Sequence, residues 1–193
     1  TRKNAPVHAT NPFRLAYTVH SSTGSAAIPT MYVDGIASGS YTVTNAAGGT
    51  IASLAQSIFA AGSGTSCFGG TIADILVYNG EHTAAEVARV DAWLAARHSL
   101  FASPPPITAN LEFWGDLGSP STSIVSGAVA TLGDSSGNGR SYTQATNTKR
   151  PTYTAVDANF GGRPSMTSDG VDDFLGRIAP AMPAMSEVTI YIV

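Results

Sequence analysis

Oxygen-bearing side chains occupy every second position in the stretch DSSGNG, residues 134–139. Asp134, Ser136 and Asn138 precede Gly139, with the spacing of the first oxygen ligands and the glycine of an EF-hand calcium loop. An alanine stands where the closing bidentate glutamate of such a loop should be. A polar turn, stabilised by Asp and Asn side chains and by glycines at positive φ, explains the same residues. We favour the turn, and calcium binding at Asp134 and Asn138 stays open.

A second acidic group follows in DGVDD, where Asp169, Asp172 and Asp173 occur within five residues. Carboxylates held this close repel one another, and a cation would relieve that repulsion. Their oxygens suit calcium or sugar hydroxyls. Solvated side chains at the end of a strand explain the cluster equally well. Asp169 and Asp172 are therefore candidate metal ligands.

Aromatic side chains beside acidic groups predict a sugar-binding surface. A pyranose presents apolar C–H patches ringed by hydroxyls, which suit an aromatic face with a neighbouring carboxylate. The candidates for glycan contact are Trp114, Tyr142 and Tyr153, with Asp116 as the carboxylate and Tyr41 as a further aromatic. Each ring could instead pack in the core, which is the more common role of such residues.

The nearest approach to a catalytic carboxylate pair is Glu112 with Asp116. Both lie on the polar face of LEFWGD, where apolar and polar residues alternate. Four residues of strand separate them by about 13 Å, which exceeds the spacing of the carboxylates in glycosidases. His82 and His98 are interpreted as polar surface residues beside the two ends of a helix. We therefore expect no enzymatic activity.

The overall charge limits the partners. Charged residues make up 12% of the chain and the net charge is −3, so we expect no basic surface for nucleic acid. No apolar run approaches the roughly 20 residues that span a bilayer, and membrane insertion is not expected. The chain starts without Met, which indicates a cut or processed end. The single cysteine, Cys67, is expected to be a small packing residue.

The elements that would position these residues are mostly short strands. Twenty glycines and eleven prolines favour an all-β protein with many turns. Asp34-Gly35 between β-formers predicts a hairpin with a type I′ turn. The nearly continuous apolar run over residues 72–78 predicts a strand covered on both faces. A β-branched final strand is predicted over residues 186–193.

One amphipathic helix is predicted over about residues 83–99. Thr83 and Glu86 match a capping box at its start. Its apolar stripe consists of Val87, Val90 and Leu94, with Trp93 at the edge. Arg97 is placed among the polar residues elsewhere around the helix. The prolines that follow end the helix.

Three stretches resemble the concanavalin A-like, LamG-type jelly-roll domains of bacterial surface and phage proteins. Residues 69–100, a last core strand followed by a capped helix, resemble the C-terminal end of such a domain, and residues 17–37 resemble the strands before it. Residues 111–176 resemble the N-terminal half, through Trp114, Asp116 and the motifs DSSGNGR, RPTY and GGRPSMTSDGVDDFL. The resemblance implies a jelly-roll sandwich of antiparallel strands.

The two halves occur in reverse order. Residues 1–101 correspond to the C-terminal half, residues 102–106 form a Pro-rich linker, and residues 107–193 correspond to the N-terminal half. One permuted sandwich or parts of two tandem domains would explain this order. We lean to the permuted sandwich, because half a sandwich leaves an apolar face and strand edges exposed. Against it, the strands that family members carry between the equivalents of Val193 and Thr1 are not found.

The resemblance implies a non-enzymatic glycan-binding or adhesion module of an extracellular, cell-surface or virion assembly, such as a phage fibre. The expected partners are glycans or cell-surface polysaccharide, virion proteins or a second copy, and calcium is the candidate cofactor. A purely structural assembly domain is the alternative, and a glycoside hydrolase is a weaker third. Exposed aromatics beside acidic groups would favour the lectin. A protein-facing edge around Val193 would favour the structural domain.

Overall fold

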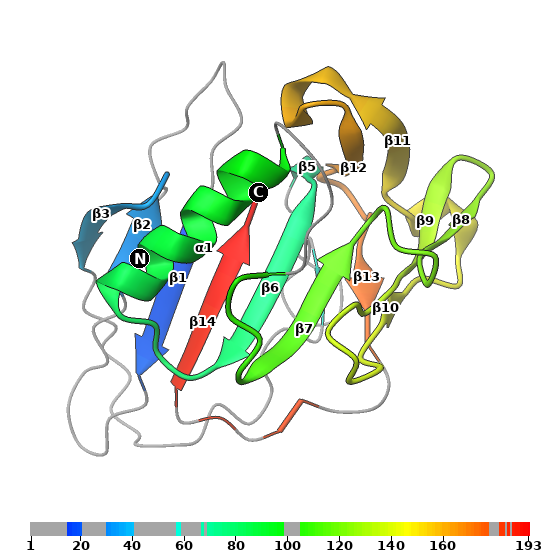
Figure 1. The fold of residues 1–193 in the computed structure, drawn as a ribbon. Coiled ribbons are helices and arrows are strands. Elements are labelled where there is room, and N and C mark those ends of the chain that lie inside the picture. The colour runs from blue at the N-terminus through cyan, green and yellow to red at the C-terminus, as the bar shows by residue number, and fades with distance from the viewer. Residues whose placement is uncertain are drawn as a thin grey trace.

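The computed structural model describes residues 15–20, 30–40, 57–58, 67, 69–98, 105–177, 182–183, 185 and 187–193. These residues form two antiparallel sheets, one α-helix and two short 3-10 turns (Figure 1). The mostly β architecture predicted from the composition is confirmed. The 3-10 turns are η1 (Asn147–Lys149) and η2 (Ala158–Phe160).

The first sheet has six strands in the order β3-β2-β1-β14-β6-β7. Their bounds are Ile36–Ser40 for β3, Thr30–Val33 for β2, Leu15–His20 for β1, Glu187–Ile192 for β14, Asp74–Asn79 for β6 and Leu111–Asp116 for β7. Every neighbouring pair is antiparallel. The last strand of the chain, β14, therefore lies between two strands from its first half.

The second sheet has eight strands, seven of them in the order β4-β13-β10-β9-β11-β12-β5, with β8 paired to β9. Their bounds are Ser57–Ile58 for β4, Leu175–Gly176 for β13, Tyr142–Thr143 for β10, Ala128–Leu132 for β9, Thr152–Asp157 for β11, Arg163–Asp169 for β12, Gly69–Ile72 for β5 and Ser123–Val125 for β8. Strands β4 and β5 from the first half flank strands from the second half. Both halves of the chain thus pair in both sheets.

Two tight hairpin turns use residues at positive φ. Asp34 and Gly35 have φ of 50° and 74°, so the predicted hairpin is confirmed. Ser126 and Gly127, between β8 and β9, have φ of 53° and 79°. A Cβ on Gly35 would also come within 2.9 Å of the Asp91 carboxylate. The β2–β3 turn therefore approaches the helix closely, and a side chain at Gly35 would require Asp91 to shift as well as a strained positive φ.

The helix α1 (Ala84–Arg97) lies across the face formed by β1, β14 and β6 (Figure 1). In β6, Leu76 and Tyr78 belong to the core cluster that contains the helix residues, whereas Ile75 and Val77 belong to the core cluster that contains the second sheet. The prediction of a strand covered on both faces is confirmed. Fully burying a side chain of this size contributes about 1.5–3 kcal/mol.

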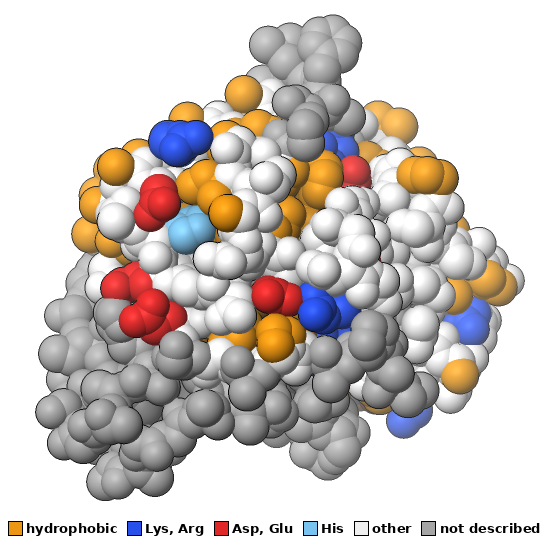
Figure 2. Space-filling view, turned by 60° about the horizontal axis from the view of Figure 1, so that its bottom comes forward, with side chains coloured by type: hydrophobic (Ala, Val, Ile, Leu, Met, Phe, Trp, Pro, Cys, Tyr) orange, Lys and Arg blue, Asp and Glu red, His pale blue; other side chains and the backbone are white. Residues whose placement is uncertain are grey.

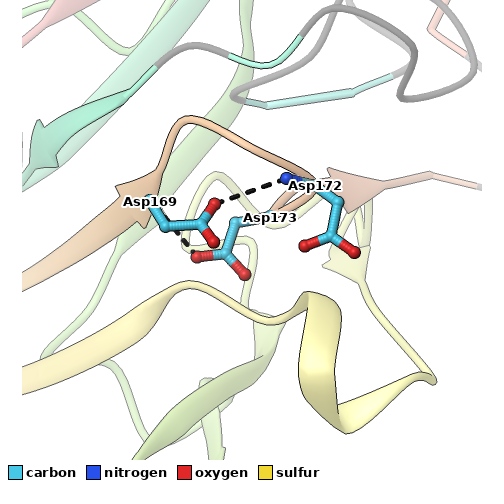
Figure 3. A group of neighbouring side chains, drawn as sticks. All are labelled: Asp169, Asp172 and Asp173. Atoms are coloured by element: carbon cyan, nitrogen blue, oxygen red, sulfur yellow. Dashed lines mark hydrogen bonds between the residues drawn. The ribbon is translucent and has the colours of Figure 1, made fainter.

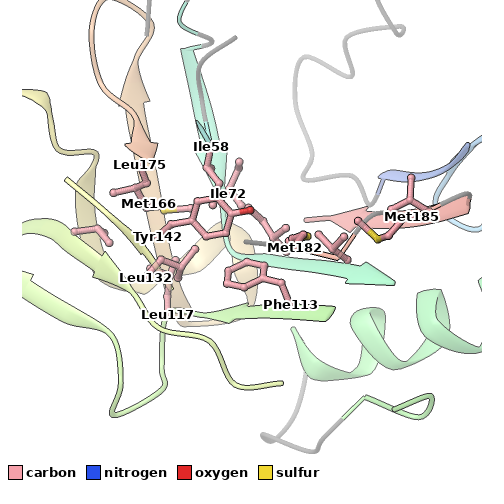
Figure 4. Packing of buried hydrophobic residues seen from close by; sticks show 14 residues of the cluster. Ile58, Ile72, Phe113, Leu117, Leu132, Tyr142, Met166, Leu175, Met182 and Met185 are labelled. Carbon is pink, nitrogen blue, oxygen red and sulfur yellow. The ribbon is translucent and has the colours of Figure 1, made fainter. Parts of the chain in front are cut away.

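The core between the two sheets is shown in Figure 4. Phe113 from β7 meets Tyr142 and Leu132 from the second sheet there. Gly115 follows on the same face, and a Cβ on it would lie 2.8 Å from a Leu132 methyl and 2.9 Å from the Phe113 ring. Glycine is therefore the residue that this close approach permits. Three methionines, which adapt to irregular space, complete this cluster: Met166, Met182 and Met185.

The predicted start of the helix is confirmed. Thr83 and Glu86 form both hydrogen bonds of the capping box, and the helix ends at Arg97 with His98 as its C-cap. The predicted stripe is buried, since Val87, Val90 and Leu94 are each 0% exposed. The placement of Arg97 on the polar side was wrong, because this residue is only 2% exposed.

Candidate functional site

Asp134 is the centre of a backbone turn. Its Oδ1 accepts hydrogen bonds from the amides of Trp114 at 3.2 Å and Ser136 at 2.8 Å. Its Oδ2 accepts one from the amide of Arg140 at 2.8 Å. Both oxygens that calcium would need are therefore engaged by backbone amides, as in a polar turn.

The same turn is bound to the outer edge of β7. Asn138 donates its side-chain N–H to the carbonyls of Leu111 at 2.9 Å and Glu112 at 3.3 Å. Arg140 donates to the Glu112 carbonyl at 3.0 Å and forms an ion pair with its carboxylate at 2.6 Å. These contacts satisfy carbonyls that an edge strand would otherwise leave open. The Asn138 side-chain amide is thus hydrogen-bonded to the backbone of β7.

A separate acidic group lies in the turn between β12 and β13 (Figure 3). Each of Asp169, Asp172 and Asp173 offers one carboxylate oxygen, and these oxygens lie within 4.8 Å of one another. Asp169 Oδ1 accepts from the amides of Val171 at 2.8 Å and Asp172 at 3.4 Å, and Asp173 Oδ2 accepts from the Asp169 amide at 3.1 Å. The structure brings the predicted ligands Asp169 and Asp172 together with Asp173, in a turn distinct from that of Asp134 and Asn138.

Two aspartates of this turn have pKa values shifted in opposite directions. The hydrogen bond from the Val171 amide lowers the pKa of Asp169. Burial raises the pKa of Asp173, and the charges of Asp169 and Asp172 add to that effect. A basic side chain is nearby, since Lys149 Nζ lies 3.9 Å from Asp172 Oδ2. Three carboxylates could hold a divalent cation, but calcium takes six to eight oxygens, so water or ligand hydroxyls would have to complete the set.

A buried arginine brings together the predicted residues Trp114 and Asp116. Arg97 donates its Nε–H to Asp74 Oδ2 at 3.1 Å, and its Nη2 lies 2.8 Å from Asp116 Oδ2. Its guanidinium carbon lies 5.2 Å from the ring centre of Trp93 and 5.1 Å from that of Trp114. We call these five residues the Arg97 cluster. It joins the end of α1 to β6 and β7.

Two further side chains extend the Arg97 cluster. His98 Nε2 lies 3.2 Å from Asp74 Oδ2, and Arg163 Nη2 donates to Asp116 Oδ1 at 3.3 Å. Burial acts to lower the pKa of Arg97, but the Asp74 and Asp116 carboxylates outweigh it and hold that pKa above its ordinary value. The arginine therefore stays charged inside the protein, which is tolerable only because it is paired.

Trp114 and Asp116 lie together as predicted for a glycan surface, but both already have partners within the chain. The Trp114 indole N–H donates to Asp74 Oδ1 at 3.3 Å, and its ring lies edge-on to Trp93 at 5.9 Å. Trp114 remains half-buried, and the Asp116 side chain is 13% exposed. The side chains of Trp114 and Asp116 therefore contact the end of the helix and the strands beneath it.

The predicted tyrosines are inside or at the rim of the core. Tyr142 is 1% exposed and meets Phe113 edge-on at 4.8 Å, with Arg177 5.4 Å above its ring. This burial corrects the prediction that Tyr142 contacts a glycan, because no ring face is open. Tyr153 is half-buried against the same core and pairs with Met166 of β12. Tyr41 lies outside the described residues.

The two histidines flank the helix as predicted, but the prediction that they are surface residues was wrong. His82 is 8% exposed and is hydrogen-bonded through Nδ1 to the hydroxyl of Tyr191 at 2.7 Å. The His98 side chain is 11% exposed and packs against Phe160 at 5.9 Å between ring centres. Their sequence neighbours gave no signal of this burial, because the partners Tyr191 and Phe160 lie far away in the sequence.

Charged side chains are dispersed over the face of the protein drawn in Figure 2. Figure 2 shows Lys and Arg side chains in small groups among acidic, hydrophobic and uncharged ones. Among the described residues, no helix is long and apolar enough to cross a membrane. At the last residue, the Val193 amide donates to the Asp74 carbonyl at 3.1 Å, and the Ala73 amide donates to the Val193 carbonyl at 2.6 Å. The backbone at Val193 is thus paired within the chain.

The described residues define an antiparallel two-sheet protein in which one amphipathic helix covers the six-stranded sheet. In comparisons with family models, curated proteins and solved structures, the chain matches none. Its function must therefore be inferred from its own residues and their geometry.

Proposed function

We propose that the chain is a non-enzymatic glycan-binding or adhesion module of an extracellular, cell-surface or virion assembly, such as a phage fibre. One observation carries the non-enzymatic part. Glu112 is ion-paired with Arg140 at 2.6 Å, and Asp116 is ion-paired with Arg97 at 2.8 Å. Glycoside hydrolysis needs two carboxyl groups that flank the scissile bond, and neither of these is free to do so.

The proposed scaffold is a permuted concanavalin A-like jelly roll. In support, β14 pairs with both β1 and β6, and β12 pairs with β5. Strands of residues 1–101 and 107–193 therefore complete each other's sheets. Such mutual pairing favours one permuted sandwich over parts of two tandem domains, since neither range buries its own sheet faces alone.

Calcium-assisted contact at the turn of Asp169, Asp172 and Asp173 is the proposed mode of glycan binding. Among the predicted ligands, Asp134 has both oxygens engaged by backbone amides. Asp169 accepts backbone amides at Oδ1 and is exposed at the surface. Calcium held by three carboxylates would still have room for water or sugar hydroxyls. The protein's own part would be to hold these carboxylates in one turn.

A glycan array probed with calcium and with a chelator tests this function. We expect binding in calcium, loss in chelator, and loss in the double variant Asp169→Asn with Asp172→Asn. The matched control is Asp34→Asn with Glu81→Gln, which removes the same charge at two other exposed residues and should bind like the wild type. A folded protein that binds no glycan would refute the glycan proposal. Binding that survives chelation and the Asp169 and Asp172 changes would refute the calcium mode alone.

A structural assembly domain is the second candidate, because several large apolar side chains are exposed. Ile124 and Val125 on β8 are 36% and 44% exposed, and Val156 and Val171 are 74% and 76% exposed. Exposed apolar side chains suit contact with another protein when they form a patch. Two results together would favour this function. The protein would bind no glycan on the array, and its molecular mass by light scattering would rise with protein concentration and be lower in Val125→Ser. Sugar release that Glu112→Gln abolishes would instead show a hydrolase.

A further inference from the structure

The N-terminal end of α1 is attached to the sheet by a buried polar group. His82 directly precedes the N-cap residue Thr83, and its amide donates to the Thr189 hydroxyl at 2.9 Å. The Thr189 hydroxyl in turn donates to the Gly80 carbonyl at 2.8 Å. The start of the helix is therefore tied to β14 through the Thr189 hydroxyl.

The His82 ring lies between two tyrosines. Its Nδ1 is hydrogen-bonded to the Tyr191 hydroxyl at 2.7 Å, and its ring centre lies 4.3 Å from that of Tyr78. Tyr78 and Tyr191 are 0% and 1% exposed. The Tyr78 hydroxyl donates to the Ile107 carbonyl at 3.0 Å. A neutral imidazole fits this neighbourhood, because one hydrogen bond satisfies Nδ1 without any buried charge.

A protonated His82 would fit poorly. Its charge would lie beside the positive end of the helix dipole. The titratable groups that face it are Tyr78 from β6, Tyr191 from β14 and Glu86 from α1. Burial raises the pKa of both tyrosines far above the ordinary value, so neither supplies a negative charge. Glu86 Oε2 already accepts from the amide and the hydroxyl of Thr83, each at 2.8 Å.

Glu86 is the charged group that acts on the pKa of His82, and further carboxylates lie around the same turn. Glu81 directly precedes His82, and its amide donates to Glu187 Oε2 at 3.5 Å. The side chains of Glu81 and Glu187 are both more exposed than that of His82. Asp91 and Tyr32 act on Tyr191 and raise its pKa further. Burial lowers the pKa of His82 below its ordinary 6.5, and Glu86 opposes this only in part.

The C-terminal end of the helix is attached by different groups. His98 lies at the negative end of the helix dipole, and its Nε2 is 3.2 Å from Asp74 Oδ2. The attachment at this end rests on Arg97 between Asp74 and Asp116 rather than on a buried neutral imidazole. Acid therefore weakens the attachment at His82 in particular.

We propose that α1 is a pH-sensitive cover of the six-stranded sheet, whose N-terminal end releases from β6 and β14 when His82 is protonated and exposes Tyr78 and Tyr191. The direction follows from linkage. A histidine that stays neutral when buried binds its proton more readily when released, so release is favoured as the pH falls below 6.5. The effect levels off once the pH passes below the pKa of the docked histidine.

Amide hydrogen exchange of the intact chain from pH 7.5 to pH 5, corrected for the intrinsic pH dependence, tests the proposal. The opening of the first helical turns should increase by up to about tenfold for each pH unit below 6.5, with a smaller change around Arg97. The neutral variant His82→Gln should lose this dependence, and the matched control His98→Gln should retain it. An equal pH response in wild type and His82→Gln would overturn the proposal.

A titration of the histidine ring protons by NMR in the wild type keeps the test independent of variant folding. We expect the His82 resonance to titrate with a midpoint below 6.5 and to change together with the exchange of the first helical turns. A midpoint at or above 6.5 would show that the docked state does not reject the proton, and would overturn the proposal.

Discussion

Both ends of α1 are attached to the six-stranded sheet, but different chemistry holds them. At the N-terminal end, His82 and Tyr191 form a neutral hydrogen bond next to the exposed capping box of Thr83. At the C-terminal end, Arg97 lies between the carboxylates of Asp74 and Asp116. Removing one partner of a neutral hydrogen bond lowers the free energy of unfolding moderately, whereas leaving a buried charge without its partner lowers it more. The two ends should therefore differ in sensitivity to single substitutions and in sensitivity to pH.

The largest effect is expected from Arg97→Met. The change keeps most of the volume but removes the arginine that pairs with the buried Asp74 and leaves Asp116 with Arg163 alone. This loss should cost about 3–5 kcal/mol in the free energy of unfolding. Urea denaturation monitored by tryptophan fluorescence measures this cost. Adding Asp74→Asn should recover part of it, since one buried charge is then removed. A loss below about 1 kcal/mol would show that the Arg97 cluster does not hold the helix.

Tyr191→Phe tests the neutral end of the helix. The ring is kept and the hydroxyl is removed, so His82 Nδ1 loses its partner at 2.7 Å. An unpaired buried polar atom costs about 1–3 kcal/mol, and the same denaturation experiment measures it. The comparison predicts a smaller loss than in Arg97→Met. The reverse order would mean that the neutral end is the stronger attachment.

Thr83→Ala should have a smaller effect. It removes the side-chain oxygen that accepts from the Glu86 amide at 3.3 Å, and loss of such a cap costs about 1 kcal/mol. Thr83→Ser keeps the oxygen and serves as the control. Helicity by circular dichroism and the midpoint of thermal unfolding would report the change. Equal stability of the two variants would contradict a role for the cap.

Lys149→Ala should have the smallest effect. Lys149 and Asp172 are 3.9 Å apart, and both side chains are 44% exposed. Exposed ion pairs contribute about 0.2–1 kcal/mol and weaken with salt. Urea denaturation at low and high ionic strength checks this. A loss comparable to that of Arg97→Met would remove the distinction between buried and exposed pairs on which the comparison rests.

Local signals predicted much of the scaffold. The capping box at Thr83, the Asp34-Gly35 turn and the alternation of β7 each depend on residues close together in the sequence, and each is present. The same holds for part of the candidate sites. Asp169 and Asp172 share a turn, and Trp114 and Asp116 share a strand face, because their spacing places them together.

The partners of those residues could not be predicted in the same way. Arg97 looked polar on a helical wheel, because the wheel contains no information about Asp74, 23 residues earlier. His82 looked exposed because Tyr191 lies 109 residues away. Tyr142 was a candidate for ligand contact with core packing as the more common alternative, and only the structure shows that the sheets meet around its ring. In each case the error concerned contacts between elements, rather than the elements themselves.

The sequence by itself determined the turns, the ends of the helix and the faces of the strands, because hydrogen bonds between near neighbours and the periodicity of apolar residues act over a few positions. Only the tertiary structure decided that β14 lies between β1 and β6 and that Arg97, His82 and Tyr142 are buried. Burial of a polar side chain depends on a partner that cancels its desolvation cost, and here those partners come from distant strands.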